Sequence, residues 1–119
     1  MSQPIGVLNG IVGTTPVRAS KFLKLQGGTN FAVENDAADT AFAFSLADVA
    51  VGGPIALIRK SLLYVTSKAS ETWNVGDPCM LGSDGQTVEP GSTNQIGVCG
   101  EYKVIGTGGG QVLIELNLA

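Results

Sequence analysis

The chain has 119 residues and a mass of 12.2 kDa, with a formal net charge of -3, 14% charged residues and 44% hydrophobic residues. A chain of this length forms one small globular domain, because it buries roughly two thirds of its unfolded surface in a single core. It contains no His, which excludes nucleophiles paired with imidazole, His general bases and the usual His-containing zinc sites. The charged fraction lies well below the ~25% of average proteins. We therefore expect exposed apolar surface and a partner or homo-oligomer.

Charge and targeting signals argue against nucleic acid and membrane partners. The chain has only seven Lys and Arg residues and a pI of about 4.7, so it lacks the broad cationic face that a phosphate backbone requires. The uncharged run 1–17 is interrupted by Pro4, Pro16 and three glycines. It is too short and too broken for a signal peptide or a membrane span. We expect the protein to be made and kept in a cytosol.

Turn signals divide most of the chain into short β-rich segments. Asp84-Gly85 is a strong hairpin signal, because Gly accepts a positive φ and Asp tolerates one. In 111–117, apolar Val112, Ile114 and Leu116 alternate with their neighbours, as in a half-buried strand. The expected strands are Val17–Leu25, Asn30–Glu34, Thr40–Leu46, Ile55–Arg59, Leu62–Ser67, Pro78–Leu81, Gln86–Val88, Gln95–Gly100 and Gln111–Asn117. The pattern predicts a compact all-β domain, either a barrel or a sandwich, over residues 17–119.

This β domain carries an internal repeat with a period of about 55 residues. Val33-Glu34 begins a stretch that ends at Val49, and Val88-Glu89 begins a similar stretch that ends at Val104. Each stretch then passes through glycines into an apolar strand, with a two-residue insertion in the second copy. Few identities support the alignment. Two similar β-units would fit the length of the chain.

Residues 1–16 differ in character from the rest and suggest an N-terminal arm. Five aliphatic side chains, Ile5, Val7, Leu8, Ile11 and Val12, occur there without a charge, and they are costly to leave in water. Glycines and prolines between them disfavour a stable independent element. An arm that pairs with a neighbouring subunit would satisfy both side chains and backbone. The alternative is a frayed terminus with one edge strand.

No combination of residues predicts an active site, a cofactor site or a metal site. The loop Gly106–Gly110 lacks the helix and the Lys of a phosphate-binding loop, so a hairpin connection is the better interpretation. The acidic run from Glu34 to Asp48 lacks the ligand spacing of a calcium loop. Cys79 and Cys99 are interpreted as small buried hydrophobic residues, with a disulfide as the alternative. Trp73 fits either a core plug or an interface anchor.

The order of several short motifs resembles the small capsid decoration, or cement, proteins of tailed bacteriophages. The resemblance covers about residues 20 to 119. Its motifs are Phe22-Leu-Lys-Leu25, Leu46-Ala-Asp-Val-Ala-Val-Gly-Gly-Pro-Ile55, Asn74-Val-Gly-Asp-Pro-Cys-Met-Leu81, Ser83-Asp-Gly-Gln86, Gln95-Ile-Gly-Val98 and Gln111-Val-Leu-Ile-Glu-Leu116. The sequence departs from the family at Ala41-Phe-Ala-Phe44, and at Cys79 and Cys99, where Val, Leu or Ala is more common.

The resemblance implies a β-tulip-like fold and a structural virion protein without enzymatic activity. Such proteins bind the outside of the expanded head, often as homo-trimers, and clamp neighbouring major capsid subunits. On this reading the arm residues Ile5, Val7, Leu8, Ile11 and Val12 contact the partner, with Trp73 as a further anchor. The alternative is a cytosolic β-barrel module that binds a peptide or a small ligand, which would be a monomer with a concave apolar pocket.

Overall fold

The computed structural model describes residues 6–27 and 29–118, and within them the chain is all-β. The compact β-barrel fold predicted from the sequence is confirmed. The strands are β1 (Val7–Val12), β2 (Lys21–Leu25), β3 (Phe31–Glu34), β4 (Ala43–Ser45), β5 (Pro54–Ile58), β6 (Lys60–Ser67), β7 (Thr72–Trp73), β8 (Pro78–Leu81), β9 (Val88–Pro90), β10 (Gly97–Cys99), β11 (Lys103–Val104) and β12 (Gly110–Asn117).

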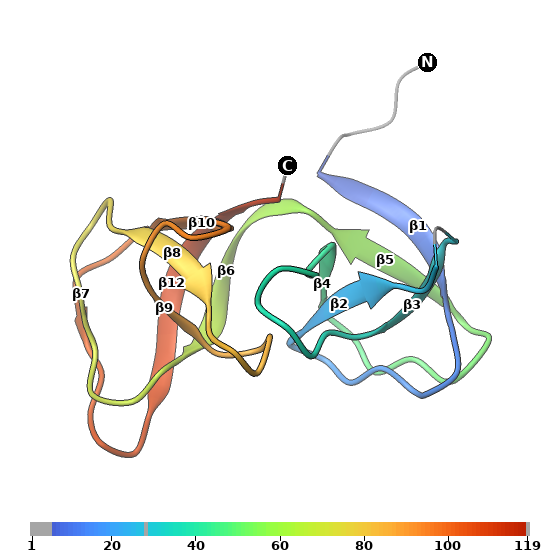
Figure 1. Cartoon of the computed structure of the whole chain (residues 1–119), viewed down its shortest axis with the longest axis horizontal. Coiled ribbons are helices and arrows are strands. Elements are labelled where there is room, and N and C mark those ends of the chain that lie inside the picture. The colour runs from blue at the N-terminus through green and yellow to red at the C-terminus, as the bar shows by residue number, and fades with distance from the viewer. Residues whose placement is uncertain (1–5, 28, 119) are drawn as a thin grey trace.

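The strands form two closed five-stranded barrels that lie side by side (Figure 1). The first barrel, residues 7–58, has the strand order β1-β3-β2-β4-β5, and β5 pairs with β1 to close it. The second barrel, residues 60–117, has the order β6-β9-β8-β10-β12, and β12 pairs with β6. Arg59 alone separates the last strand of one barrel from the first strand of the other. A two-stranded sheet of β7 and β11 completes the second half.

The two barrels match strand for strand and residue for residue in their pairing. Each contains one parallel pair, between its first and third strands, and all its other pairs are antiparallel. Residues at corresponding positions of the two barrels differ in sequence number by 54 to 57. Ala43 and Gly97, for example, differ by 54, and Leu57 and Ile114 differ by 57. The matched pairs are Leu8–Leu57 with Leu63–Ile114, Val12–Ala32 with Ser67–Val88, Leu23–Glu34 with Cys79–Pro90, Leu23–Ala43 with Cys79–Gly97, Phe44–Ile58 with Val98–Glu115 and Val17–Val49 with Trp73–Lys103. The weak repeat in the sequence therefore corresponds to a duplicated barrel.

Period-two alternation decides which side chains fill the barrels. In β12, Val112, Ile114 and Leu116 are buried, whereas the residues between them are exposed or half-buried. The paired strand β6 repeats the pattern with buried Leu63 and Val65. Interior side chains of both strands therefore meet inside the second barrel.

The two barrels share hydrophobic core. The core of the first barrel is built from small and medium side chains, among them Leu23, Ala32, Ala43 and Leu57. Phe22, Phe44 and Ile58 belong to first-barrel strands but pack in the hydrophobic cluster of the second barrel. They form a row across β2, β4 and β5, because Phe44 pairs with Phe22 on one side and with Ile58 on the other. The Phe22 and Phe44 rings meet edge to face, with centroids 4.9 Å apart. A shared core indicates that the barrels fold as one unit.

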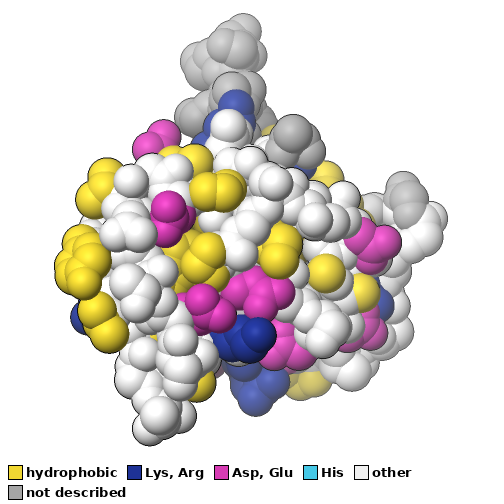
Figure 2. Space-filling model, turned by 60° about the vertical axis from the view of Figure 1, so that its left-hand side comes forward, with side chains coloured by type: hydrophobic (Ala, Val, Ile, Leu, Met, Phe, Trp, Pro, Cys, Tyr) yellow, Lys and Arg dark blue, Asp and Glu magenta, His cyan; other side chains and the backbone are white. Residues whose placement is uncertain are grey.

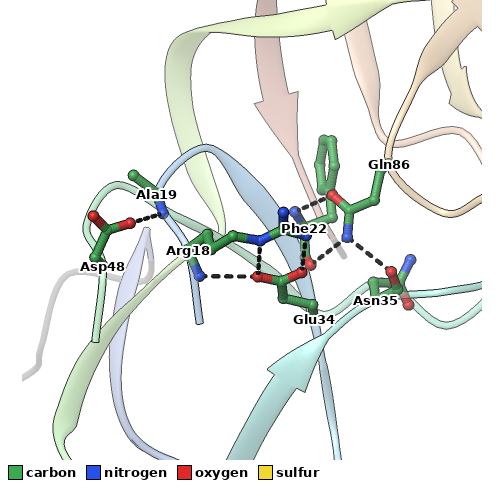
Figure 3. A network of polar contacts seen from close by, with 7 residues as sticks. All are labelled: Arg18, Ala19, Phe22, Glu34, Asn35, Asp48 and Gln86. Atoms are coloured by element: carbon green, nitrogen blue, oxygen red, sulfur yellow. Dashed lines mark hydrogen bonds and ion pairs between the residues drawn. The ribbon is translucent and has the colours of Figure 1, made fainter. Parts of the chain in front are cut away.

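A polar contact joins the barrels beside this row (Figure 3). Gln86, in the β8–β9 connection, accepts a hydrogen bond from the Phe22 backbone N–H at 2.8 Å and donates to the Phe22 carbonyl at 2.9 Å and the Asn35 carbonyl at 2.8 Å. Asn35 in turn donates from Nδ2 to the Gly85 carbonyl at 2.9 Å. The Gln86 amide thus acts as a short strand segment against β2. We call these contacts the barrel joint.

The predicted N-terminal arm is wrong for residues 7–12. They form β1, which pairs with β5 from Val7 to Ile11 and closes the first barrel. The glycines of this segment predict irregular structure, but Gly10 lies inside β1, where the absence of a side chain leaves room for Leu57. A Cβ atom at this position would lie 2.8 Å from the Leu57 side chain in the barrel interior. Residues 1–5 lie outside the described part of the chain.

Several predicted strand limits shift. The segment predicted to begin a strand at Val17 makes only an isolated bridge to Val49, and β2 begins at Lys21 after Ser20 adopts a φ of 60°. A residue in this left-handed conformation interrupts an extended strand. The Asp84-Gly85 turn lies where the sequence predicts it, with a φ of 72° at Gly85.

Candidate functional site

An apolar groove lies at one end of the first barrel, with a volume of about 330 Å³. Three large hydrophobic side chains are exposed in it: Ile11 is 36% exposed, Phe31 43% and Val51 53%. The remaining lining residues are Val12, Gly13, Thr14, Gln26 and Gly52. A contiguous exposed apolar surface on a small protein is typical of a binding site.

Strand pairing and one tight turn build this groove. Ile11, at the end of β1, pairs in parallel with Phe31, at the start of β3, so their outward side chains are neighbours. The β4–β5 turn closes over the same end, because Gly52 donates its N–H to the Val12 carbonyl and Val12 donates to the Gly53 carbonyl, both at 2.9 Å. Gly52 has a φ of 80°, which presents Val51 at the tip of the turn. No sequence motif singled out Phe31 and Val51 as site residues, although an apolar residue beside a Gly-Gly-Pro turn is a usable signal.

The second barrel has a groove at the corresponding place, and its chemistry is opposite. This groove also measures about 330 Å³. Its lining includes Lys68 and Glu89, which form an ion pair at 3.3 Å, and the carboxylate of Asp84. Thr87 in this lining occupies the position of Phe31, because the bond from the Gly82 N–H to the Thr87 carbonyl corresponds to the bond from the Gln26 N–H to the Phe31 carbonyl. The barrel fold thus accepts a polar residue at this position. The apolar lining of the first groove is therefore not a requirement of the fold.

The two halves of the chain also differ in charge. Residues 1–59 contain four acidic and four basic residues, whereas residues 60–119 contain six acidic and three basic residues. The net charge of -3 therefore falls entirely in the second half. Figure 2 shows one face of the molecule, on which Asp and Glu side chains lie above and beside Lys or Arg side chains below the centre, and hydrophobic side chains gather along the left edge.

The structure separates the predicted arm contacts into two groups. Val7 and Ile11 are exposed on the outer side of β1, and Ile11 lines the apolar groove. Val12 is only 1% exposed and Leu8 is half-buried, and both pack in the first-barrel core. Their interpretation as partner contacts is corrected, because the barrel itself buries them. Ile5 lies outside the described residues.

Trp73 is a core residue, so its alternative role as an interface anchor does not hold. It is fully buried in the second barrel, and its Nε1–H donates to Ser67 Oγ at 2.8 Å. Its pairing with Lys103 corresponds to the pairing of Val17 with Val49 in the first barrel. Trp73 therefore fills the core of the second barrel at the position where buried Val17 packs in the first.

A polar network fixes the chain between β1 and β2 (Figure 3). Glu34 accepts hydrogen bonds from the Arg18 backbone N–H at 2.9 Å, from Nε at 3.0 Å and from Nη2 at 2.8 Å. The hydrogen bond from the Arg18 side chain holds the pKa of Glu34 below its usual value. Asp48 accepts from the Ala19 N–H at 2.8 Å. These carboxylates are occupied in holding a loop.

The cysteines are buried, and neither forms a disulfide. Burial raises the pKa of the Cys79 thiol to about 12 and also raises that of Cys99, so neither thiol is an activated nucleophile. Within residues 6–27 and 29–118, no cluster of three acidic or Cys side chains suits a metal ion. The same residues contain no helix long and apolar enough to cross a membrane.

Comparison with known proteins shows a likeness to a solved structure, but not to a known family or a curated protein. No model of a known family matches the chain, and neither does any curated protein. A solved structure matches it: the head fiber gp8.5 N base in bacteriophage phi29. The two chains are 20% identical, the match covers 95% of this chain and 94% of the other, and the TM-score is 0.50. At this identity the likeness shows a shared fold, and its coverage includes both barrels.

Proposed function

We propose that this chain is a structural protein of a bacteriophage virion that attaches to the outside of the head and stabilises the expanded shell by clamping neighbouring major capsid subunits. One observation carries the proposal: 95% of the chain, including both barrels, shares its fold with the base of a phage head fiber. The order of sequence motifs, which resembles that of phage decoration proteins, supports it independently. In this proposal the chain works as a homo-trimer and has no catalytic role.

The apolar groove is the surface best suited to contact the shell. It combines exposed Ile11, Phe31 and Val51, and it belongs to the half of the chain without net charge. Burying such a groove against an uncharged surface costs little desolvation of polar groups. Many copies on one lattice would each contribute modest contacts, and bridging several subunits raises their effective concentration. A protein that binds only the expanded lattice stabilises that state by linkage.

The test is sedimentation of the purified chain with expanded phage heads that lack it. We expect wild-type chain to pellet with the heads, and Ile11→Lys to lose at least tenfold in affinity, because a charge would enter the apolar contact. Thr66→Lys is the matched control: Thr66 occupies the position of Ile11 in the second barrel and is exposed. No binding by the wild-type chain would refute the proposed function. Equal losses in both variants would refute the groove as the contact surface.

The second candidate function is a β-barrel module that binds a peptide or a small ligand. The groove favours it in one respect, because a volume of about 330 Å³ lies within the range of small-molecule sites. This function predicts a monomer that ignores phage heads. Light scattering, combined with the sedimentation experiment, separates the two functions.

A further inference from the structure

The barrel joint uses different surfaces on the two barrels. The first barrel supplies the outward row Phe22, Phe44 and Ile58 and the backbone of β2. The second barrel supplies the β8–β9 connection with Gly85 and Gln86. A contact between unlike surfaces of two similar units can repeat from unit to unit, and it then produces open filaments unless something stops it. Each barrel also has residues at the positions that the other barrel uses in the joint. A further copy of the chain would have to dock on the second-barrel positions that correspond to the apolar row, or on the first-barrel positions that correspond to the β8–β9 connection.

The second barrel's copy of the row is altered at each of its three positions. Residue pairing assigns Pro78, Val98 and Glu115 to the positions of Phe22, Phe44 and Ile58. Pro78 has no backbone N–H, so it cannot make the hydrogen bond that Phe22 gives to the Gln86 amide. Glu115 is exposed and places a charge where the joint has a buried aliphatic side chain. An arriving barrel would find neither the donor nor the apolar row.

The first barrel's copy of the connection is altered as well. Thr29 and Asn30 occupy the positions of Gly85 and Gln86, because the turn bond from the Thr29 N–H to the Gln26 carbonyl corresponds to that from Gly85 to Gly82. In the joint, a Cβ atom on Gly85 would lie 2.4 Å from the Ala37 nitrogen, so a threonine does not fit. Asn30 is one methylene shorter than the glutamine that reaches Phe22. Both exposed ends therefore lack the chemistry of the joint.

We infer that the chain is self-terminating: barrel docking occurs once, within the chain, and substitutions at Pro78, Glu115 and Thr29 prevent a second copy from adding to either end. The partner excluded is another copy of this chain docking end to end. Closed oligomers formed through other surfaces, including the proposed trimer, remain compatible. The inference does not depend on binding to a phage head.

The test restores the joint chemistry at both ends and measures mass by sedimentation velocity over a hundredfold range of concentration. One variant combines Pro78→Phe, Val98→Phe and Glu115→Ile with Thr29→Gly and Asn30→Gln. We expect its weight-average mass to rise continuously, at least doubling over the range, whereas the wild-type mass reaches a plateau. The two half variants, each restored at one end only, are the matched controls and keep the wild-type plateau. A folded full variant whose mass stays at that plateau would overturn the inference, as would open-ended growth of the wild type that Val98→Arg abolishes.

A milder variant keeps the inference testable if the full variant does not fold. Gln86→Asn places the first barrel's residue in the existing joint. We expect hydrogen exchange of the Phe22 amide to become at least tenfold faster, while the Leu57 amide in the first-barrel ladder keeps its rate. Unchanged exchange at Phe22 would show that asparagine supports the joint, and the inference would then be wrong for this end of the chain.

Discussion

Replacing Gly85 by alanine tests whether the barrel joint contributes to stability. Gly85 has a φ of 72° and lies against the first barrel, where an added Cβ would meet the Ala37 nitrogen at 2.4 Å and the Asp36 carbonyl carbon at 2.8 Å. Both atoms belong to the backbone, so neither can rotate away. The β8–β9 connection must therefore move outward, and the Gln86 amide moves with it. Gly109→Ala is the matched control, because Gly109 has a φ of 79° and no atom within 4 Å of its added Cβ.

The expected loss of stability has two parts: the cost of a left-handed backbone conformation for alanine and the cost of displacing the β8–β9 connection. A left-handed conformation costs alanine about 1–2 kcal/mol relative to glycine, and this cost applies equally to Gly85→Ala and Gly109→Ala. Displacing the connection also breaks the three hydrogen bonds of Gln86 and the one from Asn35, each contributing about 0.5–1.5 kcal/mol. We therefore expect Gly85→Ala to lower the free energy of unfolding by about 3 kcal/mol or more beyond the control.

Urea unfolding followed by the fluorescence of the single tryptophan provides the assay, since Trp73 is buried in the second barrel. Hydrogen exchange of the Phe22 amide gives a second, local measurement. The reasoning is refuted if Gly85→Ala and Gly109→Ala differ by less than about 0.5 kcal/mol, because the joint would then contribute nothing measurable beyond backbone strain.

Three further predictions follow from the same structure. Phe44→Ala should lower the free energy of unfolding by about 3–5 kcal/mol in urea titrations, because it removes a buried ring from the shared core; Leu46→Ala, at an exposed position, should change it little. At neutral pH, Arg18→Gln should have a lower free energy of unfolding than the wild type. Urea titrations over a pH series should show this difference disappearing as the pH falls below the usual Glu pKa of 4.5, because protonation of Glu34 breaks its charged hydrogen bonds to Arg18. An Ellman assay at pH 8 should leave Cys79 unreacted in the native protein and labelled in urea, since burial raises its pKa to about 12; native labelling would contradict this.

The sequence predicted the strands better than their partners. Pro78–Leu81 forms β8 with the predicted limits, and the predicted Gln111–Asn117 strand lies within β12. Both follow from local signals, a proline at a strand start and strict alternation. The glycines of the N-terminal segment predict an irregular arm, whereas residues 7–12 form a strand. Gly10 instead leaves room for the Leu57 side chain, which packs against the backbone there, and that neighbour lies 47 residues away in the chain.

For the apolar groove, the sequence pointed to Ile11 but not to its neighbours Phe31 and Val51. Ile11 was proposed as a contact residue from its apolar surroundings, but Val12 beside it has the same character and points into the core. Only strand pairing distinguishes the two, because it fixes which face of β1 looks inward. Phe31 joins Ile11 through a parallel pair, and parallel neighbours leave no local trace in sequence. The groove could therefore be recognised only from the strand pairing of the closed barrel.

Residue type and local spacing are enough to predict the all-β class, the approximate repeat, the turn at Asp84-Gly85 and the absence of His chemistry. Only the three-dimensional arrangement shows that the repeat forms two closed barrels and that Phe22 and Phe44 fill a core shared with the second barrel. It also shows that Gln86 hydrogen-bonds to β2, although the two lie 64 residues apart in the chain. Burial and hydrogen bonding depend on which groups are close in space, and strand order brings together residues that lie far apart along the chain.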